Sequence, residues 1–142
     1  MDARLNLHGN DVAARFGKYL NSAGAVVTKS ALPAATQELV KIRASQINGC
    51  SGCTDMHTKD AEHAGESRTR LNLIAAWRDA TVFTDAERAG GVTDDAWANA
   101  AKHYDDDQLA ALVCLIAVIN TYNRLSVIVR QPAGDYQPGQ WG

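Results

Sequence analysis

Two cysteines and a histidine lie close together in the sequence, at Cys50, Cys53 and His57. Residues three, four and seven apart share one face of a helix, so a helix here would bring two thiols and an imidazole together. The breaker pair Asn48-Gly49 predicts that this helix begins at or just before Cys50, with Asn48 or Ser51 as its N-cap. Unpaired N–H groups at a helix N-terminus favour a thiolate, which makes cysteine nucleophilic at neutral pH.

The C-x-x-C pair has three interpretations. The first is a dithiol that cycles to a disulfide, with His57 reaching the Cys53 sulfur as a base or hydrogen-bond partner. The second is a zinc site that uses Cys50, Cys53 and His57 as three of the usual four ligands. The third is a pair of buried thiols without chemistry. Further zinc ligands would have to come from residues at no recognised spacing, namely His63, His103 and Cys114.

The bulk composition is that of a globular chain of 142 residues, with 46% hydrophobic and 21% charged residues and a net charge of −2. No basic run accompanies this charge, so nucleic acid is not an expected partner. The N-terminus lacks an export signal and no run of about 18 apolar residues could span a membrane, so we expect a cytoplasmic protein. Three cysteines in such a chain favour redox chemistry over a structural disulfide framework.

Apolar periodicity and capping signals predict an all-α chain, because no segment alternates with the period of a strand. The expected helices cover residues 11–20, with a break at 21–24, then 33–47, 50–64 and a short stretch from Ser67. Thr84 opens a capping box that Gly90-Gly91 soon stops, and Thr93 caps another short helix. The longest helix runs from about 105 to 130. We expect one helical domain over 1–130 and an irregular tail over 131–142.

The last predicted helix is apolar almost all round between Leu109 and Ile119. Such a pattern indicates a helix buried in the core, or in the core and a subunit interface. Cys114 falls in this run, so we expect an inert core residue there.

The segment 38–57, ELVKIRASQINGCSGCTDMH, resembles the signature of the carboxymuconolactone decarboxylase superfamily in its alkylhydroperoxidase D-like branch. Its glutamate, Glu38, stands twelve residues before the first cysteine, as in that signature. The resemblance continues through 64–66, 75–78, 92–95 and 119–124 and so covers most of the chain. The decarboxylase branch generally lacks the C-x-x-C pair, so this chain is similar to the thiol peroxidases.

The resemblance implies an all-helical fold that assembles into trimers or hexamers, with the site near subunit contacts. It also implies that Cys53 attacks the hydroperoxide, that Cys50 resolves the sulfenic acid to a disulfide, and that Glu38 and His57 relay the proton. The implied partners are a hydroperoxide substrate and a reductant, either a dithiol protein or a small thiol. No cofactor and no metal are expected.

Two points stand against a simple transfer of these roles. The position at the helix N-terminus alone predicts that Cys50 is the more reactive thiol, because it lies nearer that end. We follow the resemblance and assign the attack to Cys53, because a base four residues away outweighs an end-of-helix field of about 0.3–1 kcal/mol. Family members also carry a further helix that is missing here between Ala89 and Val92. The alternatives to a peroxidase are a redox or metal sensor built on the same Cys/His cluster, and a cofactor-free decarboxylase-type enzyme that uses Glu38 and His57.

Overall fold

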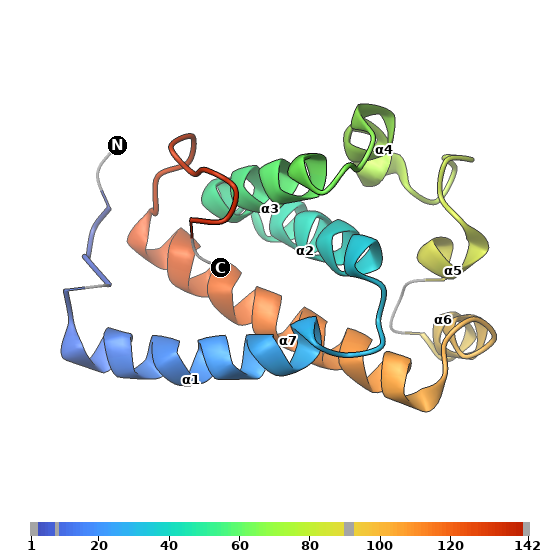
Figure 1. The fold of residues 1–142 in the computed structure, drawn as a ribbon, viewed down its shortest axis with the longest axis horizontal. Coiled ribbons are helices and arrows are strands. Elements are labelled where there is room, and N and C mark those ends of the chain that lie inside the picture. The colour runs from blue at the N-terminus through green and yellow to red at the C-terminus, as the bar shows by residue number, and fades with distance from the viewer. Residues whose placement is uncertain (1–2, 8, 90–92, 141–142) are drawn as a thin grey trace.

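The computed structural model describes residues 3–7, 9–89 and 93–140. Within these ranges the chain forms helices and no strand, which confirms the all-α prediction (Figure 1). The elements in chain order are α1 (Asp11–Thr28), α2 (Ala34–Asn48), α3 (Ser51–His63), α4 (Arg68–Leu73), the 3₁₀ helix η1 (Ile74–Ala76), α5 (Asp85–Arg88), α6 (Asp94–Ala100) and α7 (Asp106–Val129).

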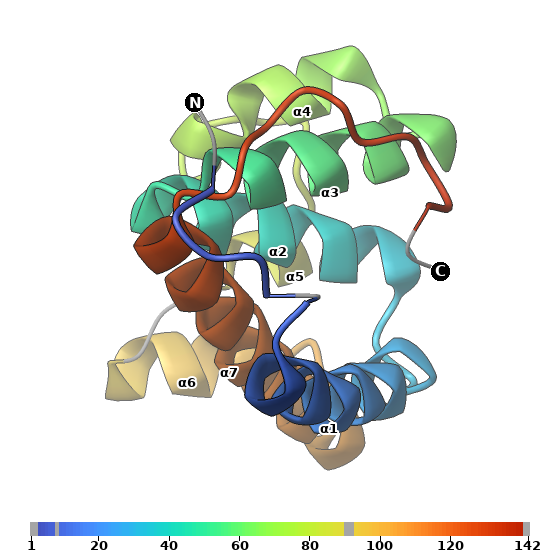
Figure 2. The ribbon, with the colours of Figure 1, turned by 90° about the vertical axis from the view of Figure 1, so that its left-hand side faces the viewer.

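Helix α2 occupies the centre of the fold. It packs against both α3 and α7, and α1 lies along α7 on the far side from α3 (Figures 1 and 2). The shorter helices α4, α5 and α6 gather at one end of this arrangement, at the right of Figure 1. The C-terminal tail then returns along α3. The helix that carries the C-x-x-C pair is therefore held between the central helix and the tail.

Side-chain caps explain why most helices start where the sequence predicts. Ser67, Thr84, Thr93 and Asp105 each accept a hydrogen bond from the backbone N–H three residues on, which satisfies a donor without a partner inside the helix. Thr84 and Glu87 complete the predicted capping box, so the four-residue helix α5 does form. Positive φ angles of 68° and 95° at Gly49 and Gly65 follow the ends of α2 and α3.

Helix α1 runs to Thr28, so the predicted break at residues 21–24 is wrong. A Cβ on Gly24 would lie 3.7 Å from Val118 of α7, an ordinary contact distance, so α1 faces α7 at this position. The hydroxyls of Ser22 and Thr28 also donate to carbonyl groups one turn back, at 2.9 and 3.1 Å. Residues that indicate a turn in the sequence alone are helical here because α7 lies against them.

The apolar run at the start of α7 is only partly covered. Leu115 and Ile119 are buried, but Val113 and Ile116 are about half exposed, with fractions of 51% and 41%. Cys114 is also exposed, so the prediction of an inert core cysteine is wrong. The sequence pattern therefore predicted more burial than α7 has within one chain. Part of its apolar surface remains exposed.

By length and composition α7 is also apolar enough to cross a membrane, the one such helix in the described ranges. That test is weak, because the core helix of a soluble protein passes it too. Here α1 and α2 pack along α7, and the fully buried polar side chain of Asn123 lies in its second half. The structure gives no strong indication of a membrane protein.

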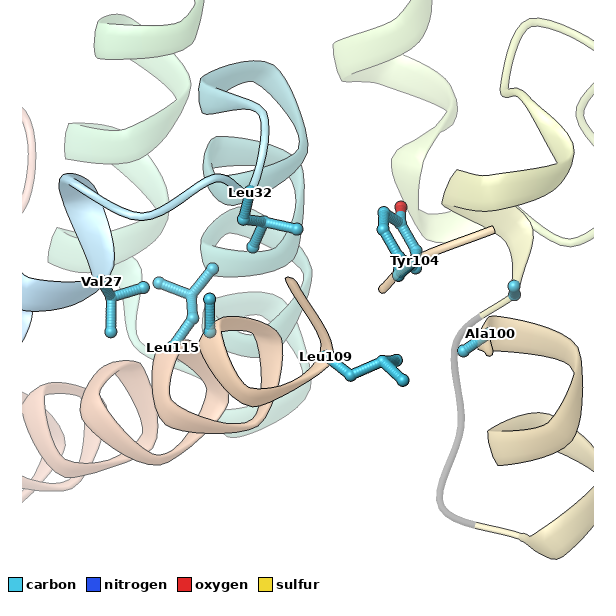
Figure 3. Close-up of a cluster of buried hydrophobic side chains, with 8 residues drawn as sticks. Val27, Leu32, Ala100, Tyr104, Leu109 and Leu115 are labelled. Atoms are coloured by element: carbon cyan, nitrogen blue, oxygen red, sulfur yellow. The ribbon is translucent and has the colours of Figure 1, made fainter. Parts of the chain in front are cut away.

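Two clusters of buried apolar side chains hold the helices together. The first joins the end of α1 to α6 and α7 (Figure 3). Its members are Val27, Leu32, Ala89, Ala100, Tyr104, Leu109, Ala111 and Leu115. The second joins α2 and α3 to α4 and η1, and its members are Leu39, Ile42, Ala61, Leu71, Ile74 and Phe83. Because Leu39 and Ile42 face this second cluster, the neighbouring Glu38 is set at the boundary between α2 and α3.

The junction at which a family helix was expected to be missing falls largely outside the described residues, which omit Gly90 to Val92. On either side, α5 ends at Arg88 and α6 begins at Asp94. Helix α5 is anchored despite its length, because Glu87 forms an ion pair with Arg70 at 2.6 Å.

Candidate active site

The two cysteines lie at the start of α3 and are joined by a disulfide. Cys50 itself is the N-cap: its Sγ accepts a hydrogen bond from the backbone N–H of Cys53 at 3.2 Å. The expectation that Asn48 or Ser51 would cap this helix is therefore wrong. The cap position gives Cys50 an extended backbone, and the turn that follows brings the Cα atoms of the two cysteines to 5.4 Å.

Both cysteines are buried, with exposed fractions of 2% for Cys50 and 5% for Cys53. Cys50 nevertheless lines an open hollow of about 560 Å³, while Cys53 is not among the residues that line it. The lining residues come from the start of α3, the end of α7 and the tail: Gly49, Cys50, Ser51, Ser126, Val127, Arg130, Gln131, Pro132 and Ala133. The hollow therefore lies on the Cys50 side of the disulfide, although little of either cysteine is exposed.

Glu38 of α2 and His57 of α3 meet across the helix interface. Glu38 Oε2 lies 3.0 Å from His57 Nδ1, and Oε1 lies 2.6 Å from Lys41 Nζ. The side chains of Glu38 and His57 are 20% and 11% exposed, so the pair is largely shielded from water. His57 follows Cys53 by one helical turn, so the predicted site residues lie on α2 and on the first two turns of α3 with its N-cap.

Glu38 is ionised under ordinary conditions. Burial alone would raise its pKa, but the hydrogen bond with His57 and the charge of Lys41 outweigh burial and hold the pKa of Glu38 below its usual value. A carboxylate only accepts hydrogen bonds, so His57 must donate from Nδ1. In the neutral ring Nε2 is then the basic nitrogen, which leaves it available to take a proton.

Asp60 and Tyr136 join this pair, and the sequence analysis missed both. The ligand atoms of Glu38, His57 and Asp60 lie within 4.8 Å of one another. Tyr136 of the tail donates a hydrogen bond from its hydroxyl to Asp60 Oδ1 at 2.7 Å. The spacing of three residues from His57 to Asp60 on a helix could have suggested Asp60, but no local signal pointed to Tyr136.

The group of Glu38, His57 and Asp60 could hold a metal ion, although Lys41 already balances Glu38. This group shares His57 with the zinc set considered from the sequence but includes neither cysteine. The sulfurs of a disulfide are not thiolate ligands, so in this state a metal would rely on imidazole and carboxylate groups. The other zinc candidates, His63, His103 and Cys114, are exposed and lie outside the group.

A buried polar network fixes the turn before α3 to α7. Asn123 and Ser45 have no exposed surface, and Asn123 Nδ2 donates to Ser45 Oγ at 3.0 Å. Asn48 donates to Asn123 and to Asn120 at 3.0 and 2.7 Å. The Cys50 N–H donates to the Ser45 carbonyl at 2.9 Å. Buried amides that are paired in this way hold one arrangement, so Cys50 has a fixed place relative to α7.

Comparison with known proteins agrees with this architecture. The model of the carboxymuconolactone decarboxylase family matches residues 11–91. The uncharacterized protein YdfG of Bacillus subtilis is 36% identical over an alignment of 112 positions, and the match covers 70% of this chain and 76% of YdfG. The chain belongs to the carboxymuconolactone decarboxylase family.

Solved structures place this family member in the AhpD-like branch that the motif predicts. A protein of unknown function from Agrobacterium tumefaciens, ATU0492, has been suggested to be the antioxidant defence protein AhpD. It matches with a TM-score of 0.87 and 31% identity, over 95% of this chain and 100% of its own. An uncharacterized peroxidase-related protein with an AhpD core, from Ralstonia eutropha, matches with a TM-score of 0.74 and 14% identity over 87% of this chain and 74% of its own.

The debrominase Bmp8 has the same fold, with a TM-score of 0.73 and 17% identity over 88% of this chain and 72% of its own. At this identity the likeness concerns the fold alone. One fold thus carries a debrominase and a peroxidase-related protein, so the reaction of this chain has to be argued from its own side chains.

Proposed function

We propose that this protein is a thiol-dependent peroxidase that reduces hydroperoxides through a Cys50–Cys53 disulfide cycle. The observation that supports the proposal most is the place of the disulfide. It lies at the N-terminus of α3, one turn before a histidine whose Nδ1 is 3.0 Å from an ionised glutamate. A nucleophile, a base and a group that orients the base are the parts that activation of a thiol requires.

In the proposed cycle His57 takes the proton of the Cys53 thiol, and Glu38 holds the imidazole in place. The thiolate attacks the terminal oxygen of the hydroperoxide, the one that carries hydrogen, so that an S–O bond forms and the O–O bond breaks. The proton on His57 passes to the departing oxygen, which leaves as an alcohol. Cys50 then attacks the sulfur of the Cys53 sulfenic acid, and the disulfide forms as water leaves.

A thiol reductant restores the enzyme by thiol–disulfide exchange. It loses two electrons and becomes a disulfide, while Cys50 and Cys53 return to thiols. Both a dithiol protein and a small thiol fit this step. A cytoplasmic location belongs to the same proposal, since a reducing compartment supplies such thiols and keeps a catalytic disulfide transient.

The exposed face of α1 supports the proposal of a homo-oligomer. Val12, Phe16, Tyr19 and Val26 are spaced by four, three and seven residues, and each is 51% to 78% exposed. This spacing forms a single apolar stripe, which is typical of a helix face that packs on another helix. A trimer or hexamer would cover it. Sedimentation of the protein and of Phe16→Asp tests this: the substitution should shift the assembly towards monomer.

The deciding experiment treats the reduced protein with one equivalent of an organic hydroperoxide and counts free thiols. We expect two thiols to be lost, and mass spectrometry to show that the peptide with Cys50 and Cys53 is lighter by two hydrogens. Turnover should be lost in Cys53→Ser and retained in the matched control Cys114→Ser, which removes an exposed cysteine.

Each alternative function gives a different result. Full turnover in Cys53→Ser would refute the thiol cycle. Activity on a carboxylated substrate that survives loss of both cysteines would favour the decarboxylase-type reaction at Glu38 and His57. Slow thiol oxidation together with stoichiometric metal in protein purified without chelator would favour a sensor.

A further inference from the structure

The C-terminal tail crosses the helix that carries the disulfide. Residues 131–140 leave the end of α7 and run back along α3 (Figure 2). Lys59 Nζ donates to the carbonyl oxygens of Gly134 and Tyr136 at 2.8 and 3.0 Å. Asp55, which pairs with Lys59 at 2.9 Å, accepts from the Gly134 N–H at 3.1 Å. The tail is thus held to α3 by its own backbone.

The side chain of Tyr136 provides a second attachment. Its hydroxyl donates to Asp60 at 2.7 Å, on the same helix as Lys59. Burial, together with the hydrogen bond to Asp60 and its charge, raises the pKa of Tyr136 to about 12. The phenol therefore keeps its proton and remains a donor across the physiological range. The two attachments fix the tail over the outer face of α3.

The tail approaches the backbone closely at Gly52, between the two cysteines. A Cβ at this position would lie 3.2 Å from the Pro132 carbonyl oxygen and 3.7 Å from that of Gln131. A side chain would press on the tail there, so the glycine permits this close contact. The same tail residues, with Ala133, line the hollow at Cys50 opposite the last turn of α7. The tail is therefore one wall of the opening that reaches Cys50.

We propose that the tail, held to α3 through Lys59 and Tyr136, restricts by size which thiols reach the disulfide at Cys50. The inference rests on the proposed function, because it concerns the reductant of that cycle. A thiolate enters from the hollow and attacks Cys50 Sγ, so that a mixed disulfide forms and Cys53 leaves as a thiolate. The second thiolate of the reductant then attacks its own bound sulfur and releases Cys50. Two electrons pass from the dithiol to the protein, and the protons of its two thiols end on the two cysteines or in solvent.

The test measures how fast the oxidised full-length protein is reduced by a small dithiol, dithiothreitol, and by a protein dithiol, reduced thioredoxin. Lys59→Met and Tyr136→Phe remove tail contacts while keeping the apolar part of each side chain. One hydrogen bond is worth roughly a fivefold change in an equilibrium. We expect the ratio of the thioredoxin rate to the dithiothreitol rate to rise about fivefold in Tyr136→Phe, which loses one hydrogen bond, and about 25-fold in Lys59→Met, which loses two.

The matched control lies on α1, on the opposite side of the fold from the tail, where Lys18→Met changes an exposed side chain and should leave the ratio unchanged (Figure 2). Gly52→Ala gives an independent variant, since its methyl group displaces the tail without removing a polar group, and it should also raise the ratio.

An unchanged ratio in all three tail variants overturns the proposal, as does a thioredoxin rate that stays undetectable in every one. Equal rises for both reductants also overturn it, because they indicate general loosening of α3. The disulfide is formed with diamide rather than a peroxide. The ratio of the two reduction rates can therefore be measured even if the protein has no peroxidase activity. Failure of the size restriction is then distinguishable from failure of the peroxidase proposal.

Discussion

Replacing Glu38 by glutamine tests whether oxidation of the thiols depends on the negative charge of this side chain or only on its size and shape. The substitution keeps the size of the side chain but removes the charge that pairs with Lys41 at 2.6 Å and holds His57 at 3.0 Å. If the pair relays a proton, its loss should slow oxidation of the reduced cysteines by an organic hydroperoxide by about 100-fold, or roughly 2.7 kcal/mol.

The same substitution should cost stability by a smaller and separable amount. A hydrogen bond to a charged group contributes about 1.5–3 kcal/mol, so the free energy of unfolding should fall by about 2 kcal/mol. For a chain of this size that lowers the Tm by roughly 6 °C. A domain with a typical stability of about 5–15 kcal/mol remains folded at 25 °C, so unfolding cannot account for the loss of rate.

Glu87→Gln is the matched control. Like Glu38, Glu87 forms an ion pair at 2.6 Å, here with Arg70, and its side chain is 13% exposed. Its pKa is held low against burial by Arg70 and by Thr84, so its charge state resembles that of Glu38. The assay follows thiol loss in a stopped-flow instrument after mixing with hydroperoxide. Glu38→Gln that reacts as fast as the parent protein, or no slower than Glu87→Gln, would refute the relay.

The buried network, the turn before α3 and the charge on Glu38 give three further expectations. Asn123→Ala should lower the free energy of unfolding in urea by about 3 kcal/mol, since it removes the buried hydrogen bonds with Ser45 and Asn48 and leaves a cavity; a loss below about 1 kcal/mol would show that the network adds little. Gly49→Ala should cost about 1 kcal/mol by the same measurement, because φ is 68° and no atom lies within 4 Å, so only backbone strain acts. The difference in free energy of unfolding between the parent protein and Glu38→Gln should be present at neutral pH and disappear as the pH falls below 4.5, because the pKa of Glu38 is lowered in the folded state. A difference that persists in acid would contradict this.

Helix starts could be predicted from the sequence because their signals are local. A threonine cap and the residue three positions on are fixed by short-range geometry, and Thr84 and Thr93 both cap as predicted. The neighbourhood of Glu38 and His57 could be predicted for a similar reason, since only a short turn separates α2 from α3.

The errors arose where the outcome depends on a distant part of the chain. Small residues within α1 indicate a turn or a close helix contact, and only the position of α7 decides between them. An all-round apolar helix does not show which side lacks a neighbour, so Cys114 could not be placed. Tyr136 reaches Asp60 across 76 positions of sequence, and no spacing rule connects them.

The N-cap of α3 is a sulfur atom, which unlike a serine or aspartate oxygen can change its bonding partners. In the oxidised protein Cys50 Sγ accepts the Cys53 N–H at 3.2 Å. A thiolate would be a stronger, charged acceptor at the same position, and a mixed disulfide would move the sulfur towards its new partner. Hydrogen exchange and the NMR shift of the Cys53 amide should therefore differ between these states. A single backbone proton can report, without any label on the cysteines, how the protein is distributed along its redox cycle.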